Sequence, residues 1–99
     1  MHWEDSEVTA YCSCKVCCGK NSPEIGGHGL TRSGHTPIEG LTAACDPARL
    51  GAWVDVPSVG LRLCEDTGSA VLGSAVDVYI AEHGRARRFG RKALRVEWQ

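Results

Sequence analysis

Short runs in which apolar and polar residues alternate recur along most of this chain. Side chains alternate between the two faces of a β-strand, so a half-buried strand shows this pattern. One helical segment, Ala81–Phe89, has a plausible stop at Gly90. Six or seven short strands with one short helix near the C-terminus predict a small, mainly β barrel. The strands are expected at Glu7–Tyr11, Gly40–Asp46, Ala52–Val56, Leu61–Glu65, Val76–Ile80 and Ala93–Trp98.

Length and composition narrow the class of protein. The 99 residues fit one domain, 1–99, and 42% of them are hydrophobic, which is typical of a globular protein. The net charge of −1 offers no general attraction for nucleic acid, and the basic cluster at residues 85–92 is expected to be a solvated helix face. No apolar run approaches the ~18 residues of a membrane span. We expect a monomer that does not bind nucleic acid and does not span a membrane.

Three aspartates lie at the edges of predicted strands or within them. Asp46 precedes Pro47, and Asp66 precedes Thr67-Gly68; both are turn sequences in which a carboxylate accepts backbone N–H bonds. Asp77 lies inside an apolar strand, where a carboxylate lowers stability unless it faces solvent or is paired. A structural role is the simpler interpretation of each aspartate. Carboxylates that cluster raise one another's pKa, as a general acid at neutral pH requires.

Six motifs, in order along the chain, resemble the 3D domain, a family named for three aspartates. The resemblance extends over residues 7–98, and the cysteine-rich segment at residues 11–20 is similar to that of cysteine-rich members. It implies a double-psi β-barrel, like the catalytic domain of membrane-bound lytic transglycosylase A and cell-wall proteins of spore-forming bacteria. The motifs are GLTRSG (29–34), GLTAACDP (40–47), RLG (49–51), EDTG (65–68), VDVY (76–79) and RFGR (88–91).

The same resemblance implies a site that cuts peptidoglycan glycan strands. Asp77 is the expected catalytic acid, Asp66 its partner and Asp46 a support. Thr9 is expected nearby on the first strand. The substrate-binding residues expected from the resemblance are Tyr11, Thr31, Ser33, Gly68 and Ser69.

The implied reaction is that of a lytic transglycosylase. Protonated Asp77 donates to the glycosidic oxygen between N-acetylmuramic acid and N-acetylglucosamine, and an oxocarbenium-like centre develops. The 6-hydroxyl of the muramic acid then attacks and forms a 1,6-anhydro end, while Asp77 accepts its proton. Two alternatives stay open: an inverting glycoside hydrolase, and a non-catalytic barrel that binds the cell wall.

The sequence departs from the family pattern at a few positions. Ser69 replaces a second Gly, Leu72 replaces a Lys, and Cys45 and Cys64 replace small apolar residues. Loss of the Lys removes a cation near the expected cleft, which favours the non-catalytic alternative. None of these departures falls on the three aspartates.

The cysteines leave three states open: disulfides, a zinc site and free thiols. Disulfides suit a small secreted domain and are the favoured prediction, so no cofactor is expected. The Cys14-x-x-Cys17 spacing suits a structural zinc instead, held by Cys12, Cys14, Cys17 and Cys18 with Cys45 or Cys64, or with His28 or His35. The histidines are otherwise expected on the surface or in loops, with His35 a candidate for the site. The six cysteines, all disulfide candidates, are Cys12, Cys14, Cys17, Cys18, Cys45 and Cys64.

Two further expectations concern the tryptophans and the place of action. Trp53 lies in a predicted strand and is expected in the core, while Trp3 and Trp98 are expected to pack on each other. Residues 1–10 lack the apolar stretch of a signal peptide. We expect action at the cell envelope or outside the cell, reached by phage delivery or after removal of a leader.

Overall fold

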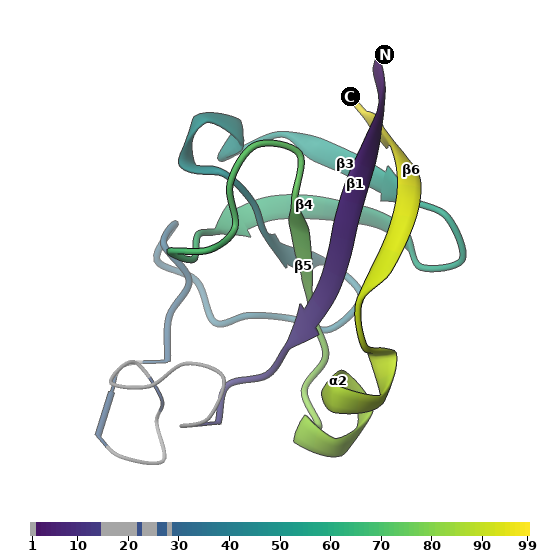
Figure 1. Ribbon diagram of the computed structural model, residues 1–99. Coiled ribbons are helices and arrows are strands. Elements are labelled where there is room, and N and C mark those ends of the chain that lie inside the picture. The colour runs from purple at the N-terminus through teal and green to yellow at the C-terminus, as the bar shows by residue number, and fades with distance from the viewer. Residues whose placement is uncertain (1, 15–21, 23–25, 28) are drawn as a thin grey trace.

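Six strands form a closed barrel in the computed structural model, which describes residues 2–14, 22, 26, 27 and 29–99. Around the barrel their order is β1-β5-β2-β4-β3-β6 (Figure 1). The prediction of a mainly β barrel with one short helix near the C-terminus is confirmed. The strands are β1 (His2–Tyr11), β2 (Thr42–Ala44), β3 (Trp53–Val56), β4 (Gly60–Asp66), β5 (Val76–Tyr79) and β6 (Lys92–Trp98).

Parallel and antiparallel pairing are mixed in the barrel wall. β1 runs parallel to β5, and β2 runs parallel to β4, whereas the other neighbours are antiparallel. Parallel neighbours need long connections, because the chain must return to the same end before it pairs again. β3 lies in the connection between β2 and β4, and β2, β3 and β4 all lie in the connection between β1 and β5. This interleaved arrangement fits the double-psi barrel that the sequence resemblance implies.

Small and β-branched side chains fill the barrel. Valines dominate because their branched side chains suit the pleated wall, and each buried valine contributes about 1.5–3 kcal/mol relative to exposure. Trp98 lies among them, with the Arg49 guanidinium over its ring at 4.0 Å. The core comprises Val8, Ala43, Cys45, Val54, Val56, Cys64, Val76, Val78, Val96 and Trp98.

Two expectations about the tryptophans are wrong. Trp53 is 39% exposed and is absent from the core. Trp3 is 49% exposed and lies opposite Glu97, whereas Trp98 lies opposite His2 and is buried. Because successive residues of a strand point to opposite faces, Trp3 and Trp98 face opposite sides of the wall.

The strand bounds differ from the sequence prediction at two places. β1 begins at His2, five residues earlier than expected, because its first half pairs with β6 from Lys92 to Trp98. That half is mostly exposed, so it lacks the pattern of a half-buried strand. β2 ends at Ala44, because the chain turns through the 3-10 helix η3 (Pro47–Arg49).

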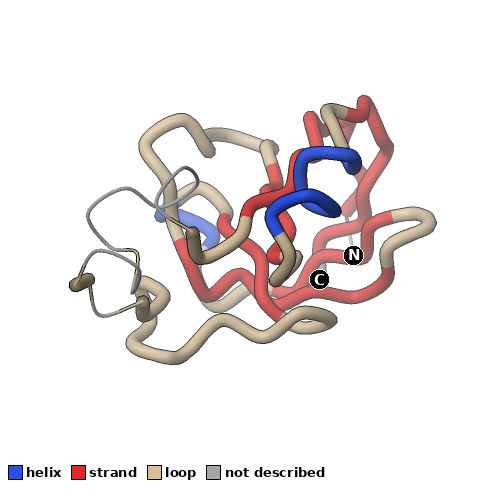
Figure 2. The backbone as a smooth tube through the Cα atoms, turned by 90° about the horizontal axis from the view of Figure 1, so that it is seen from below, coloured by secondary structure: helices blue, strands red, loops and turns tan. Residues whose placement is uncertain are grey.

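The helix α2 (His83–Phe89) lies at the end of the barrel opposite the two chain termini (Figure 1). It ends at Gly90, whose φ of +71° suits a residue without a side chain. Seen from below, α2 crosses the lower end of the strands (Figure 2), and its own residue Ala86 is buried. No helix among the described residues is long and apolar enough to cross a membrane.

An ion pair fixes the segment before β2 to the start of α2. Arg85 donates to the two carboxylate oxygens of Glu39 at 2.8 and 2.9 Å, and the Ala81 N–H donates to Glu39 Oε1 at 2.9 Å. These bonds, Arg85 first, lower the pKa of Glu39 to about 2. Salt screens such an exposed pair. Its forked geometry nevertheless positions the segment around Glu39 against the start of the helix.

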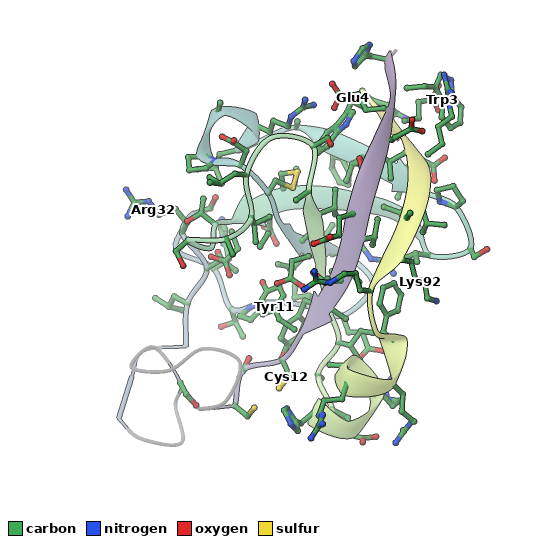
Figure 3. All side chains as sticks on the ribbon, in the orientation of Figure 1. Trp3, Glu4, Tyr11, Cys12, Arg32 and Lys92 are labelled. Carbon is green, nitrogen blue, oxygen red and sulfur yellow. A yellow bond between two sulfur atoms is a disulfide. The ribbon has the colours of Figure 1, made fainter. Side chains whose placement is uncertain are left out.

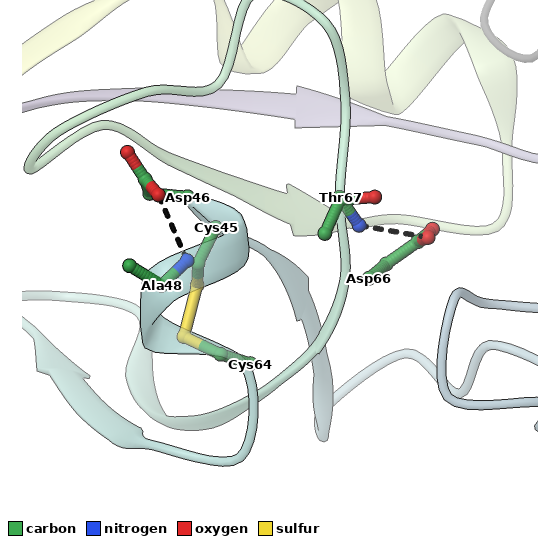
Figure 4. Close-up of a disulfide and its surroundings, with 6 residues drawn as sticks. All are labelled: Cys45, Asp46, Ala48, Cys64, Asp66 and Thr67. Atoms are coloured by element: carbon green, nitrogen blue, oxygen red, sulfur yellow. Dashed lines mark hydrogen bonds between the residues drawn. A yellow bond between two sulfur atoms is a disulfide. The ribbon is translucent and has the colours of Figure 1, made fainter.

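A disulfide joins Cys45, directly after β2, to Cys64 in β4 (Figure 4). Both half-cystines are fully buried. A sulfur in a disulfide is not available to a metal, so the zinc alternative loses Cys45 and Cys64 as ligands. The expected partners Cys17, Cys18 and His28 lie outside the described residues.

Candidate active site

The side chains of the candidate site share one face of the barrel wall, on β1, β5, β2 and β4. Ala44 in β2 lies opposite Asp77 on one side and Asp66 on the other. Paired residues on neighbouring strands share a face, so the two carboxylates lie on the same side of the wall, separated by one strand. The alternate residues, such as Val78 and Cys64, point into the core.

A β-bulge places Asp66 on this face. Ala43 pairs with Cys64, but the next residue, Ala44, pairs with Asp66, so Glu65 is an extra residue in β4. In a strand without a bulge, strict alternation would direct Cys64 and Asp66 to the same side. Bulges commonly re-aim side chains in this way next to functional sites. The buried Glu65 carboxylate accepts the Thr42 hydroxyl at 2.6 Å, which anchors the bulge.

Asp77 has the environment of a weak acid. Its Oδ1 accepts the hydroxyl of Thr9, its partner on β1, at 3.0 Å. Burial raises the pKa of Asp77 to about 6; the Thr9 bond opposes this shift, and the charge of Asp66 adds to it. The contribution of Asp66 is the smallest of the three, as expected for two carboxylates separated by a strand.

Asp66 is held by three donors. The Tyr11 hydroxyl donates to Oδ2 at 2.9 Å, and the backbone N–H groups of Arg32 and Thr67 donate to Oδ1 at 2.9 Å each. These bonds fix the orientation of the carboxylate. They also join three segments, because Tyr11 ends β1, Arg32 precedes β2 and Thr67 follows β4.

The Asp46 carboxylate has a structural role. Its Oδ1 accepts the Ala48 N–H at 2.9 Å and caps η3 (Figure 4), while its Oδ2 accepts the Gly73 N–H at 2.7 Å. These backbone bonds, Ala48 first, lower the pKa of Asp46. A carboxyl group with a lowered pKa is a poor general acid. Asp46 therefore shapes the loop between β4 and β5 rather than the proton chemistry.

A pair of tyrosines borders the carboxylates. Tyr11 and Tyr79 lie opposite each other on β1 and β5, with ring centroids 5.4 Å apart in an edge-to-face arrangement. They pack with Ala44 and with Val71 of the loop between β4 and β5. The Tyr79 hydroxyl is 3.0 Å from Ser13 Oγ. Aromatic rings with polar ends suit contact with sugars, because they combine an apolar face with hydrogen-bonding groups.

The segment with Thr31 and Ser33 approaches the site mainly through its backbone. Thr31 is buried, and its hydroxyl accepts the His35 N–H at 3.2 Å, so the threonine supports a turn. The Ser33 N–H donates to the Glu65 carbonyl at 3.0 Å, which brings the exposed Ser33 next to the bulge. His35 is exposed.

The loop after Asp66 carries the remaining expected contact residues. Gly68 packs closely, since a Cβ there would lie 3.1 Å from Val71 Cγ2. Ser69 is exposed, and Leu72 is 60% exposed. The place where the family pattern has a Lys is therefore open to solvent.

Some features of the site had no clear signal in the sequence. The backbone N–H of Arg32 carries no side-chain signature. Tyr79 could have been selected, because it lies two residues after Asp77 and shares its face of β5. The sequence predicts His83 on the surface or in a loop, yet it begins α2 and its ring contacts two cysteine sulfurs near the end of β1.

Comparison with known proteins yields two matches. The family model described as "3D domain" matches residues 41–98, which is more than half of the chain. A Bacillus subtilis (strain 168) protein, named as a putative cell wall shaping protein, YabE, is 31% identical over 90 residues. That match covers 90% of this chain but 21% of the relative, so the chain spans about a fifth of the relative's length.

Proposed function

The chain belongs to the 3D domain family, and on this premise we propose that it cleaves the glycan strands of peptidoglycan as a lytic transglycosylase. A cell-wall-related function is supported by the family and by the name of the Bacillus relative. The proposal of a lytic transglycosylase rests on Asp77, whose pKa is raised to about 6 by burial. A carboxyl group with that pKa is still partly protonated near neutral pH, so it has a proton to donate and accepts one readily after donation.

The proposed reaction begins with a sugar bound across β1 and β5. Asp77 donates its proton to the glycosidic oxygen that leaves with N-acetylglucosamine, and positive charge develops at the anomeric carbon of N-acetylmuramic acid. The 6-hydroxyl of that muramic acid attacks the anomeric carbon and gives its proton to Asp77, which regenerates the acid. Bond formation and proton transfer balance without a water molecule, and the product carries a 1,6-anhydro end.

Asp66 and Thr9 have supporting roles in this scheme. The three donors on Asp66 fix its carboxylate on the same face of the wall as Asp77, from where it stabilises the cationic centre electrostatically. The Thr9 hydroxyl donates to Asp77 Oδ1 and stabilises the carboxylate formed after proton donation. Tyr11 orients Asp66 through its hydroxyl and offers its ring to the sugar.

An inverting hydrolase is less well supported by the same contacts. It needs a second carboxylate that removes a proton from water. Asp66 is the candidate, but three of its roughly four acceptor positions already hold donors. Few positions on this carboxylate are left to accept a proton from water, which favours attack by the sugar's own hydroxyl.

Mass spectrometry of the material released from purified sacculi tests the proposal. The wild-type protein is expected to release muropeptides that are lighter by one water than the hydrolysed forms. Asp77→Asn is expected to lose activity by about 100-fold or more, the usual contribution of a general acid. Asp5→Asn, which changes an exposed carboxylate on β1, is the matched control and is expected to retain activity.

Three outcomes would contradict the proposal. Products with hydrolysed ends would indicate the inverting hydrolase. Binding to sacculi without release of muropeptides would indicate a wall-binding barrel, in line with the loss of the family Lys at Leu72. Full activity of Asp77→Asn would remove Asp77 from the chemistry.

A further inference from the structure

Two cysteines and a histidine converge at the end of the barrel that carries α2. Cys12 directly follows β1, Cys14 lies two residues later, and His83 is the first residue of α2. The two sulfurs are 3.0 Å apart, and His83 Nδ1 lies 3.4 Å from Cys12 Sγ and 3.1 Å from Cys14 Sγ. Figure 3 shows Cys12 where β1 ends beside α2. We propose that this trio binds a structural zinc ion.

The donor atoms suit zinc in type. Thiolate and imidazole are the ligands of structural zinc, and a soft sulfur pair disfavours calcium and magnesium, which take oxygen. All three donor atoms lie within 4.8 Å of one another. Around a tetrahedral zinc with bonds of about 2.0–2.3 Å, donor atoms lie roughly 3.5–3.8 Å apart. Each pair of donor atoms therefore has to move apart by less than about 1 Å to accept the ion.

The backbone at both ends of the trio is fixed by bonds outside it. The Ile80 N–H donates to the Tyr11 carbonyl at 2.8 Å, so the pairing of β1 with β5 continues to the residue before Cys12. On the other side, Glu39 holds both Ala81 and Arg85 around His83. Cys12 itself is 1% exposed. A preformed arrangement of this kind lowers the ordering cost of binding.

This proposal differs from the zinc alternative that the sequence suggested. That alternative drew its second pair of ligands from Cys45 and Cys64, or from His28 and His35. The disulfide occupies Cys45 and Cys64, and the structure brings His83 to Cys12 and Cys14 instead. A water or another side chain completes the coordination.

Zinc here would fasten the segment after β1 to α2. Ser13, between the two cysteines, lies 3.0 Å from the Tyr79 hydroxyl, so the metal would also steady the tyrosine pair beside the carboxylates. The role is structural and makes no use of Asp77. The inference therefore stands apart from the proposed function, and either can fail alone.

The full chain, purified under reducing conditions that leave the buried disulfide intact, gives the test. Loaded with zinc and dialysed, it is expected to hold one zinc per chain by elemental analysis and native mass spectrometry. Cobalt in place of zinc is expected to give thiolate-to-metal charge-transfer absorption and the intense visible bands of a tetrahedral site. Bound zinc is expected to raise the Tm and to protect Cys12 and Cys14 from alkylation.

Variants assign the ligands. Cys12→Ser, Cys14→Ser and His83→Gln are each expected to weaken zinc binding by about 100-fold or more, because each ligand carries a large share of the binding free energy. His35→Gln, which changes an exposed histidine, is the matched control and is expected to bind as wild type does. Asp77→Asn is expected to bind zinc normally.

The proposal is overturned by any of three results. These are a wild-type chain without stoichiometric zinc, a cobalt spectrum without thiolate bands, or His83→Gln with unchanged zinc affinity. A disulfide that includes Cys12 or Cys14 in the purified wild-type chain would also overturn it. Because the cobalt spectrum and the alkylation pattern use the wild-type protein, the test holds even where a variant fails to fold.

Discussion

The three aspartates of this chain differ in what surrounds each carboxyl group. Asp77 is largely buried with one hydroxyl donor, Asp66 has three donors, and Asp46 accepts two backbone N–H groups. Burial disfavours a charge, whereas donors stabilise it. The resemblance to the 3D domain singled out these three aspartates, and their catalytic roles stay a prediction. It did not predict the donors that separate their roles, because Tyr11, Arg32 and Gly73 are distant along the chain.

Asp77→Asn is expected to stabilise the protein at neutral pH. The pKa of Asp77 is raised from its ordinary value of 3.8 to about 6, so the folded state binds the proton more tightly than the unfolded state does. Stability therefore falls as pH rises from about 4 to 6, and the loss is fully present above that range. The cost is up to about 3 kcal/mol.

Urea unfolding of wild type and Asp77→Asn between pH 4 and 7.5 measures this effect. The variant's advantage is expected to be largest at pH 7.5 and to shrink steadily toward pH 4. Asp5→Asn serves as the control, with a pH dependence like that of wild type. An advantage that does not change with pH would contradict the assignment of the raised pKa to Asp77.

Among the elements, the loop between β4 and β5 depends on Asp46. This carboxylate bonds both Ala48 in η3 and Gly73 in the loop, and Gly73 has a φ of +65°. The pattern of the sequence predicted turns at these places, but neither η3 nor the contact between them. A 3-10 turn of three residues and a bond across 27 positions leave no periodic signal.

Asp46→Ala is expected to lower the Tm while leaving kcat for muropeptide release close to wild type. Its pKa is lowered in the folded state, so its stabilising effect is present above about pH 4 and disappears as pH falls through the folded pKa. Thermal unfolding at pH 7 and pH 3 checks both statements. Asp55→Ala, on β3, is the matched control. Loss of kcat without loss of Tm would instead place Asp46 in the chemistry.

For the whole molecule, barrel closure and the Cys45–Cys64 disulfide supply the framework. Six strands were predictable because alternation marks half-buried strands. Their order was not, since β1 pairs with both β5 and β6 and no local pattern encodes such distant pairing. The resemblance to the 3D domain supplied the topology. The bulge at Glu65, which aims Asp66, became visible only from the register of β2 and β4.

The Cys45–Cys64 disulfide closes a loop with a sequence separation of 19. Its loss is expected to lower stability by about 3 kcal/mol, or roughly 10–20 °C in Tm for a domain of this size. Calorimetry of the zinc-free protein with and without reductant measures this change in Tm. The double variant Cys45→Ala/Cys64→Ala is the control, and its Tm is expected to be the same with and without reductant. An equal response to reductant in both proteins would assign the effect to other cysteines.

The account depends most on an Asp77 carboxyl group whose pKa is raised to about 6, so that part of it is still protonated near neutral pH. Nuclear magnetic resonance titration of its side-chain carboxyl carbon, assigned by comparison with Asp77→Asn, measures this directly in the unliganded protein. We predict a pKa of about 6 for Asp77. A pKa near the ordinary value of about 4 for an aspartate would contradict the assignment of Asp77 as the acid.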